Sequence, residues 1–410
     1  MPESATIQTV GGGTTAPIDA PAPGFPQAVI LLLASCLSVL GAVLLAPVLP
    51  KMEDAFEGTS GVDILVPITL TIPALMIGLL SPVAGSIVDR LDRKRLLVGA
   101  LVLYAVFGAM PLWLDSLVLI VVSRAVVGVT EAAIMTCCTT LIADYFTGPR
   151  RAKYLGLQVV FTNVSSIVFF ALGGALGNVG WRVPFWLYIV SPVLAVLVAL
   201  FIWQPHPPAG KAQQGLAPVP WRTLATPCGV TLFGGLVFYI PIAELSFVLD
   251  DIGVDDTTTV GLVSAGAAVA TAIGALVFGR VSGRGPGVLL PIGFVLAGIG
   301  AVVMALGSST AVVAIGDTIA SAGGGLLLPT LLTWAISQLR FEERGRGTGL
   351  WTASFNLGQF FCPLLVLALA AAMTGRSSAI VLLGAASVAV SVTLVTALRL
   401  RTVEPTDSGG

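Results

Sequence analysis

Residues 27–49 read QAVILLLASCLSVLGAVLLAPVL, an apolar run that contains no charged side chain. A helix needs about 20 predominantly apolar residues to cross the hydrocarbon core of a bilayer. This stretch therefore predicts a transmembrane helix, and the remainder of the chain repeats its pattern.

Eleven further stretches of the same kind follow, separated by clusters of turn-forming and charged residues. The twelve predicted spans are 27–49, 63–83, 96–114, 117–143, 156–178, 184–203, 226–249, 258–278, 287–307, 310–337, 349–372 and 378–398. Hydrophobic residues make up 56% of the chain and charged residues only 10%, against about 25% charged in a soluble domain. We therefore predict an all-α integral membrane protein with twelve transmembrane helices, and exclude a water-soluble enzyme.

Basic residues are concentrated on one side of the predicted membrane. The connections after spans 2, 4, 6, 8 and 10, with the C-terminus, hold sixteen of the twenty Lys and Arg residues, and the opposite connections hold three. Because cytoplasmic loops carry an excess of Lys and Arg, both termini are predicted to lie in the cytoplasm, as in a multi-pass protein of the cytoplasmic membrane. The formal net charge of −1 argues against a nucleic-acid partner.

Side chains suited to catalysis or metal binding are scarce. The five cysteines lie in apolar runs without metal-ligand spacing, and the one histidine, His206, lies in a Pro-rich stretch. The chain contains no G-x-x-x-x-G-K-[ST] motif for nucleotide binding. We therefore expect no cofactor, no metal site and no enzymatic activity.

The two halves of the chain share an internal repeat. Residues 151–157 read RAKYLGL and residues 344–350 read RGRGTGL, at a constant offset of 193 residues. Parallel repeats of this kind are typical of secondary transporters. The predicted units are a disordered cytoplasmic tail at 1–26, a six-helix bundle at 27–203, a cytoplasmic linker at 204–225, a second six-helix bundle at 226–401 and a cytoplasmic tail at 402–410.

The connection between spans 2 and 3 carries the most specific motif. Residues 85–95 read GSIVDRLDRKR, which resembles the G-x-L-x-D-R-x-G-R-R-x signature of the major facilitator superfamily and departs from it at Ile87 and at Asp92, where the family has Gly. The resemblance extends over residues 27–401 and implies two pseudo-symmetric six-helix bundles with a cytoplasmic gate at this motif. A basic loop that only sets the membrane orientation is the alternative. The residues implied for the gate are Gly85, Asp89, Arg90 and Arg93.

Spans 4 and 5 resemble the family less completely. Arg124 and Gly128 in span 4 are similar to the start of the R-x-x-x-G-x-G motif of proton-coupled members, and Glu131 follows on the same helical face. Drug antiporters of the family carry G-x-x-x-G-P-x-x-G-G in span 5. Residues 165–174 read SSIVFFALGG, which keeps the final Gly-Gly but has Phe-Phe in place of Gly-Pro.

Four ionisable side chains lie well inside the predicted spans. They are Arg124, Glu131, Glu244 and Asp317. Each costs about 2.5–3.5 kcal/mol on membrane-insertion scales, which indicates a functional role in proton coupling or translocation. They occupy spans 4, 7 and 10, and the resemblance implies that these spans line a central cavity together with span 1.

Arg124 and Asp317 occupy equivalent positions of the repeat. We expect them to face each other across the cavity as a charge pair that forms and breaks during transport, and a static pair that joins the halves is the alternative. Glu131 lies near the membrane midplane, where loss of water favours a protonated carboxyl, so it is the first candidate for proton coupling and Asp317 the second. An internal partner for Arg124 is the other role open to Glu131. Glu244 lies nearer the outer mouth.

Uncharged polar side chains and tryptophans inside the spans are candidates for the substrate cavity. They are Asn163, Tyr239, Trp334, Trp351, Asn356 and Gln359. Asn163 and Asn356 are related by the repeat, so a shared structural role is the alternative for them. For the tryptophans the alternative is packing.

These features predict a proton-coupled secondary active transporter that moves small organic molecules by alternating access. Few hydrogen-bonding groups line the expected cavity, which favours export of amphipathic drugs or metabolites. The alternative is uptake of an organic anion by proton symport through Arg124. A membrane enzyme or a sensor is a different class, for which the catalytic residues or a signalling domain are lacking. The expected partners are the substrate, protons and the lipid bilayer, and the resemblance implies a monomer.

Overall fold

Helices form all the regular structure in the described part of the chain. The computed structural model describes residues 24–90, 92–204, 221–340 and 343–403, and the side chains of residues 84–90 and 397–403 lie outside this description. Twelve helices among the described residues are long and apolar enough to cross a membrane, as predicted. Most of the predicted tails and of the predicted linker falls outside the described residues.

The helices divide into two groups in chain order. The N-terminal bundle contains α1 (Phe25–Leu45), α2 (Leu49–Ala55), α3 (Val62–Arg90), α4 (Arg93–Ala109), α5 (Leu117–Tyr145), α6 (Gly148–Val179), the 3-10 segment η3 (Val183–Ile189) and α7 (Val190–Phe201). The C-terminal bundle contains α8 (Trp221–Asp251), α9 (Thr257–Val281), α10 (Pro286–Leu306), α11 (Thr310–Ser337), α12 (Arg344–Ala372) and α13 (Arg376–Val403).

Several helices are longer than the apolar runs that predicted them. The run predicted at 156–178 lies within α6, which begins at Gly148 because the polar residues before the run continue the same helix. The first predicted span also extends beyond residue 49. Pro47 interrupts it with a short 3-10 turn, and α2 then continues to Ala55. Hydropathy thus identifies the part of a helix that lipid can cover, and the helix itself extends beyond that part.

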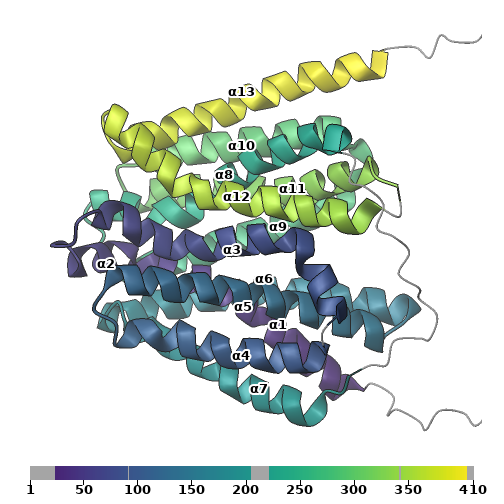
Figure 1. Cartoon of the computed structure of the whole chain (residues 1–410). Helices are drawn as coiled ribbons and strands as arrows, with labels where there is room; N and C mark the ends of the chain where they lie inside the picture. The colour runs from purple at the N-terminus through teal and green to yellow at the C-terminus, as the bar shows by residue number, and fades with distance from the viewer. Residues whose placement is uncertain (1–23, 91, 205–220, 341–342, 404–410) are drawn as a thin grey trace, which may run out of the picture.

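The two bundles lie side by side, with α4 and α7 at one outer edge and α10 and α13 at the other (Figure 1). The beginning of α1 and the end of α13 lie on one face of the molecule, here called the terminus face (Figure 1). The opposite face carries α2 and is here called the far face. Between the bundles, α3 packs against α12 and α6 packs against α9.

Glycines allow both of these helix pairs to approach closely. Near the far face, a Cβ atom on Gly174 of α6 would lie 2.8 Å from the Cα atom of Gly261 on α9. Near the terminus face, a Cβ atom on Gly349 of α12 would lie 2.9 Å from the carbonyl oxygen of Ser81 on α3. Small residues are used in this way at helix interfaces in membranes, because they bring backbones into van der Waals contact. The bundles are therefore in glycine-mediated contact at two places. One lies between α6 and α9 near the far face, and the other between α3 and α12 near the terminus face.

Hydrogen bonds reinforce the contact between the bundles at the far face. The amide of Asn178, at the end of α6, donates to Asp256 at 2.5 Å and to the hydroxyl of Thr258 at 2.8 Å. Asp256 also caps α9 by accepting from the backbone N–H of Thr259 at 3.0 Å. The hydrogen bonds from Thr259 and Asn178 lower the pKa of Asp256 to about 2. Asp256 therefore remains ionised at physiological pH.

We predict that Gly174→Ala destabilises the protein by about 1–3 kcal/mol, because the added methyl group has no room against α9. The measurement is the midpoint of thermal unfolding in detergent, which should fall. Gly156→Ala on the same helix is the matched control, since no atom lies within 4 Å of the added Cβ. Equal midpoints for the two variants would show that the α6–α9 contact relaxes without cost.

Candidate functional site

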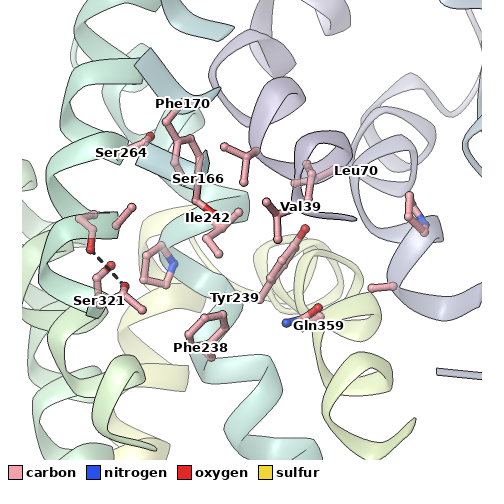
Figure 2. A pocket seen from close by; sticks show the side chains of 18 of the residues that line it. Val39, Leu70, Ser166, Phe170, Phe238, Tyr239, Ile242, Ser264, Ser321 and Gln359 are labelled. Atoms are coloured by element: carbon pink, nitrogen blue, oxygen red, sulfur yellow. Dashed lines mark hydrogen bonds between the residues drawn. The ribbon is translucent and has the colours of Figure 1, made fainter. Parts of the chain in front are cut away.

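A cavity of about 310 Å³ lies between the two bundles. Its wall is built from α1, α3, α5 and α6 of the N-terminal bundle and from α8, α9, α11 and α12 of the C-terminal bundle. Figure 2 shows part of this lining, in which Tyr239 and Phe238 of α8 lie between side chains of both bundles. The volume is at the lower end of the roughly 300–1,000 Å³ of small-molecule sites.

Six of the residues singled out in the sequence contribute to this wall. They are Glu131, Asn163, Tyr239, Asp317, Asn356 and Gln359. The repeat-related asparagines have the same local geometry, because Asn163 donates to the carbonyl of Val159 at 2.8 Å and Asn356 to that of Thr352 at 2.9 Å. Each amide nitrogen is thus bonded four residues back along its own helix. The repeat accounts for this shared conformation, and a contact with substrate stays a prediction for both residues.

The two predicted tryptophans do not line the cavity. Trp334 borders a smaller space between α11 and the beginning of α10, and it lies about 100° round α11 from Asp317, since seventeen residues separate the two. Trp351 stacks on Phe355, one turn later on α12, with ring centroids 5.7 Å apart. The structure therefore places both tryptophans in the packed core rather than in the cavity wall, and a contact with substrate stays a prediction for them.

A buried polar cluster lies behind the cavity wall in the N-terminal bundle. Arg124 of α5 is fully buried, and its Nη1 donates to the hydroxyl of Tyr188 in η3. Its Nε donates to the backbone carbonyl of Thr69 in α3 at 3.4 Å. Tyr104 of α4 packs on Tyr188, with ring centroids 4.9 Å apart, so three helices and η3 meet at one guanidinium group.

Glu131 connects this cluster to the cavity. It is 3% exposed and lies two turns after Arg124 on the same face of α5. The hydroxyl of Tyr104 lies 3.4 Å from Oε1 of Glu131 and donates more closely, at 2.6 Å, to the carbonyl of Leu37. Glycine at position 41 of α1 makes room for both charges. A Cβ atom at Gly41 would lie 2.5 Å from Oε1 of Glu131 and 2.6 Å from Nη2 of Arg124.

The expected pair between Arg124 and Asp317 is not formed. Arg124 is held by partners within its own bundle, and both carboxylate oxygens of Asp317 are buried without a hydrogen-bond partner among the described residues. A hydroxyl group and a backbone carbonyl close to α5 bind the guanidinium, so Arg124 lies behind the wall rather than across the cavity. The alternative role of Glu131, as an internal neighbour of Arg124, fits this arrangement better.

Glu244 lies away from the cavity, near the far face. Arg376 at the beginning of α13 lies 3.8 Å from Glu244 and 3.5 Å from Glu53 of α2. The guanidinium of Arg376 also lies 3.8 Å above the ring centroid of Phe247. These contacts join the two bundles at the far face, and a role for Glu244 in proton coupling stays a prediction.

The predicted gate motif is only partly visible. The side chains of Gly85, Asp89 and Arg90 lie outside the described residues. Arg93, the first residue of α4, forms an ion pair with Asp144 near the end of α5. Asp92, which stands where the family motif has Gly, caps α4 by accepting from the N–H of Arg95 at 3.0 Å. Asp92 has an extended backbone conformation, so the turn forms without the glycine.

Sequence reasoning missed Tyr104, Tyr188 and Gly41. A tyrosine within a predicted apolar span was the available signal for the first two, because a buried hydroxyl usually finds a hydrogen-bond partner. Gly41 could not be distinguished by sequence from the many other glycines. No cluster of three or more His, Cys, Asp or Glu side chains that could hold a metal occurs within the described ranges.

Two six-helix bundles around a central cavity define the fold of a secondary membrane transporter. The family model of the Major Facilitator Superfamily matches residues 31–242 and 225–409, so the chain belongs to this family of transporters. A bacterial homologue of the human lysosomal transporter Spinster, inward-facing and occupied, has a TM-score of 0.72 at 16% identity and covers 90% of this chain and 94% of its own. A variant of the nucleoside transporter NupG has a TM-score of 0.70 at 11% identity, with 90% and 99% covered. These likenesses show the fold.

Curated relatives match over shorter stretches. Protein spinster homolog 3 of Danio rerio is 32% identical over 142 residues, which are 33% of this chain and 28% of the relative. The quinolone resistance protein NorA of Staphylococcus aureus is 28% identical over 200 residues, 47% of this chain and 50% of the relative. The tetracycline resistance protein, class H, of Pasteurella multocida is 24% identical over 176 residues, 43% and 44% of the two chains. The chain thus spans half or less of the length of these relatives.

We predict that Tyr188→Phe destabilises the protein by about 1–3 kcal/mol, because it leaves a buried guanidinium N–H without an acceptor. The free energy of unfolding in detergent, followed by urea or heat, measures the effect. Tyr154→Phe is the matched control, since the Tyr154 ring packs on Phe146 at 4.2 Å and its hydroxyl bonds to no described residue. If both variants were equally stable, Arg124 would not depend on Tyr188.

Proposed function

We propose that this protein is a proton-driven transporter that exports small amphipathic molecules across the cytoplasmic membrane. The observation that carries the proposal is Glu131, a carboxyl group in the wall of a cavity between the bundles with a buried guanidinium two helical turns behind it. Intramembrane carboxyl groups of this kind mark proton relays in transporters.

The neighbours of Glu131 suit a proton carrier. When Glu131 is ionised, Arg124 compensates its charge and the hydroxyl of Tyr104 lies within hydrogen-bond distance. When Glu131 takes up a proton, it becomes neutral and the guanidinium of Arg124 loses its counter-charge. The electrostatic interactions among α1, α4 and α5 change as a result. Movement of one charge through 100 mV supplies about 2.3 kcal/mol, so proton entry can drive this change without a nucleotide.

Several observations favour export of amphipathic molecules. The cavity wall is mainly apolar, with hydroxyl and amide groups from α6, α9, α11 and α12. NorA and the class H protein, two of the relatives, are resistance proteins by name. The excess of Lys and Arg on the loops of the terminus face favours placing that face in the cytoplasm. We also propose that a single chain forms the working unit, since the cavity lies within one chain.

Uptake of an organic anion is supported less well. That function would require a positively charged side chain in the cavity wall. The described lining residues include Glu131 and Asp317 but no Lys, Arg or His, and Arg124 lies behind Glu131. Glu131 is therefore a better candidate for the centre of the mechanism than Arg124.

The test is accumulation of an amphipathic compound panel in a bacterial host that lacks its own efflux pumps. Cells that express the protein should accumulate less of some compounds, and a protonophore should abolish the difference. Glu131→Gln should also abolish the difference at equal expression, because the amide keeps the shape of the carboxyl but does not take up or release a proton at physiological pH.

Glu57→Gln is the matched control, because the same chemical change falls on an exposed residue and should preserve export. Export that persists in Glu131→Gln would remove this residue from the mechanism. Protonophore-resistant export would contradict proton coupling, and higher accumulation of an anionic compound would favour uptake instead.

A further inference from the structure

Asp317 is the one carboxyl group in the described cavity wall that lacks a compensating charge. It is 0% exposed, and both of its oxygens are without a hydrogen-bond partner among the described residues. No Lys or Arg side chain among the described residues forms an ion pair with it. A buried carboxylate with neither a hydrogen bond nor a counter-charge is strongly disfavoured.

The repeat explains why Asp317 has no internal partner. The offset of 193 residues relates Arg124 to Asp317, and it relates the partners of Arg124 to small or apolar residues. Tyr104 corresponds to Ala297, and Glu131 corresponds to Gly324. Tyr188 similarly corresponds to Val381. The C-terminal bundle therefore has a charge at the equivalent position but lacks the groups that satisfy it.

Close packing also directs Asp317 toward the cavity. The preceding residue, Gly316, faces α10, where a Cβ atom would lie 2.7 Å from the Cα atom of Met304. Asp317 follows about 100° round the helix, so it lies outside that contact and contributes to the cavity wall. Ser321, one turn later on α11, contributes to the same wall (Figure 2).

From this arrangement we infer that Asp317 is the recognition site for the positively charged group of an amphipathic organic cation. Glu131 is compensated by Arg124, so Asp317 supplies the uncompensated negative charge of the cavity. Phe170, Phe238 and Tyr239 contribute aromatic side chains to the wall, and aromatic faces attract cations in a desolvated site. The ligand class is thus a monovalent cation with an apolar, preferably aromatic, body. This inference rests on the proposed use of the cavity as the substrate site.

The test compares two ions of nearly the same size and shape but opposite charge, tetraphenylphosphonium and tetraphenylborate. Binding of each to the purified protein in lipid nanodiscs is measured at equilibrium, with protein-free nanodiscs as the background. The wild-type protein should bind tetraphenylphosphonium more tightly than tetraphenylborate. Asp317→Asn should weaken tetraphenylphosphonium binding by at least about tenfold, as expected for removal of one partner of a desolvated charge pair, and should not weaken tetraphenylborate binding.

Two further variants make the result specific. Glu131→Gln removes a charge that Arg124 already compensates, so its effect on tetraphenylphosphonium should be smaller than that of Asp317→Asn. Glu57→Gln removes an exposed charge and should leave both affinities unchanged. Equal losses in Asp317→Asn and Glu131→Gln would overturn the assignment, because the general field of the cavity would then explain binding. Unchanged tetraphenylphosphonium affinity in Asp317→Asn would overturn it as well.

The comparison of the two ions on the wild-type protein does not depend on how any variant folds. Preference of the wild-type protein for tetraphenylborate would overturn the inference. Because binding is measured without a proton gradient, its outcome is separable from that of the proposed function. Proton-driven export with no role for Asp317 in binding would reject this inference alone, and Asp317-dependent binding without proton-driven transport would reject only the proposed function.

Discussion

A fully buried guanidinium group governs the construction of the N-terminal bundle. Arg124 cannot be hydrated within the bilayer, so its hydrogen bonds must come from the protein, and a charge without such bonds would be prohibitively costly. The carbonyl of Thr69 and the hydroxyl of Tyr188 accept from Nε and Nη1, Nη2 has no hydrogen-bond partner among the described residues, and Glu131 supplies the nearby opposite charge. Because these groups belong to different helices, the requirement of one side chain sets the positions of α3, α5 and η3, and Gly41 sets the distance to α1.

The described part of the C-terminal bundle has the same arrangement of helices but lacks an equivalent polar cluster around a buried arginine. Several of its helices approach closely through glycine, as where Gly300 and Gly316 bring α10 and α11 together. Asp317 occupies the position of Arg124 but inherits none of its partners. The two halves therefore differ in chemistry more than in architecture. One half encloses a charge-compensated network, and the other presents a single carboxyl group in a mostly apolar wall.

The number of spans and the division into two bundles could be predicted because both depend on local composition and on a repeat. The candidate residues on the cavity helices could also be identified from the sequence, since a charged or polar side chain stands out in an apolar span. The absence of a pair between Arg124 and Asp317 could not be predicted from the sequence, because equivalent positions in a repeat do not specify which neighbours a long side chain contacts. Trp334 and Trp351 show the same limit, since their positions depend on helix rotation and on packing partners such as Phe355.

The glycine contact between α6 and α9 has an energetic consequence for motion. Two glycine surfaces bury little side-chain area, and the backbone groups behind them are already hydrogen-bonded within their own helices. Parting them exposes few unsatisfied groups, so lipid tails or water can replace the contact at small cost. Resistance to separation then comes from directional polar contacts at the end of α6, where Asn178 bonds to Asp256 and Thr258 and the hydroxyl of Thr257 donates to the carbonyl of Gly174 at 2.8 Å. Together with the ion pair between Arg376 and Glu53, a few polar contacts at this face hold together two glycine surfaces that otherwise separate easily.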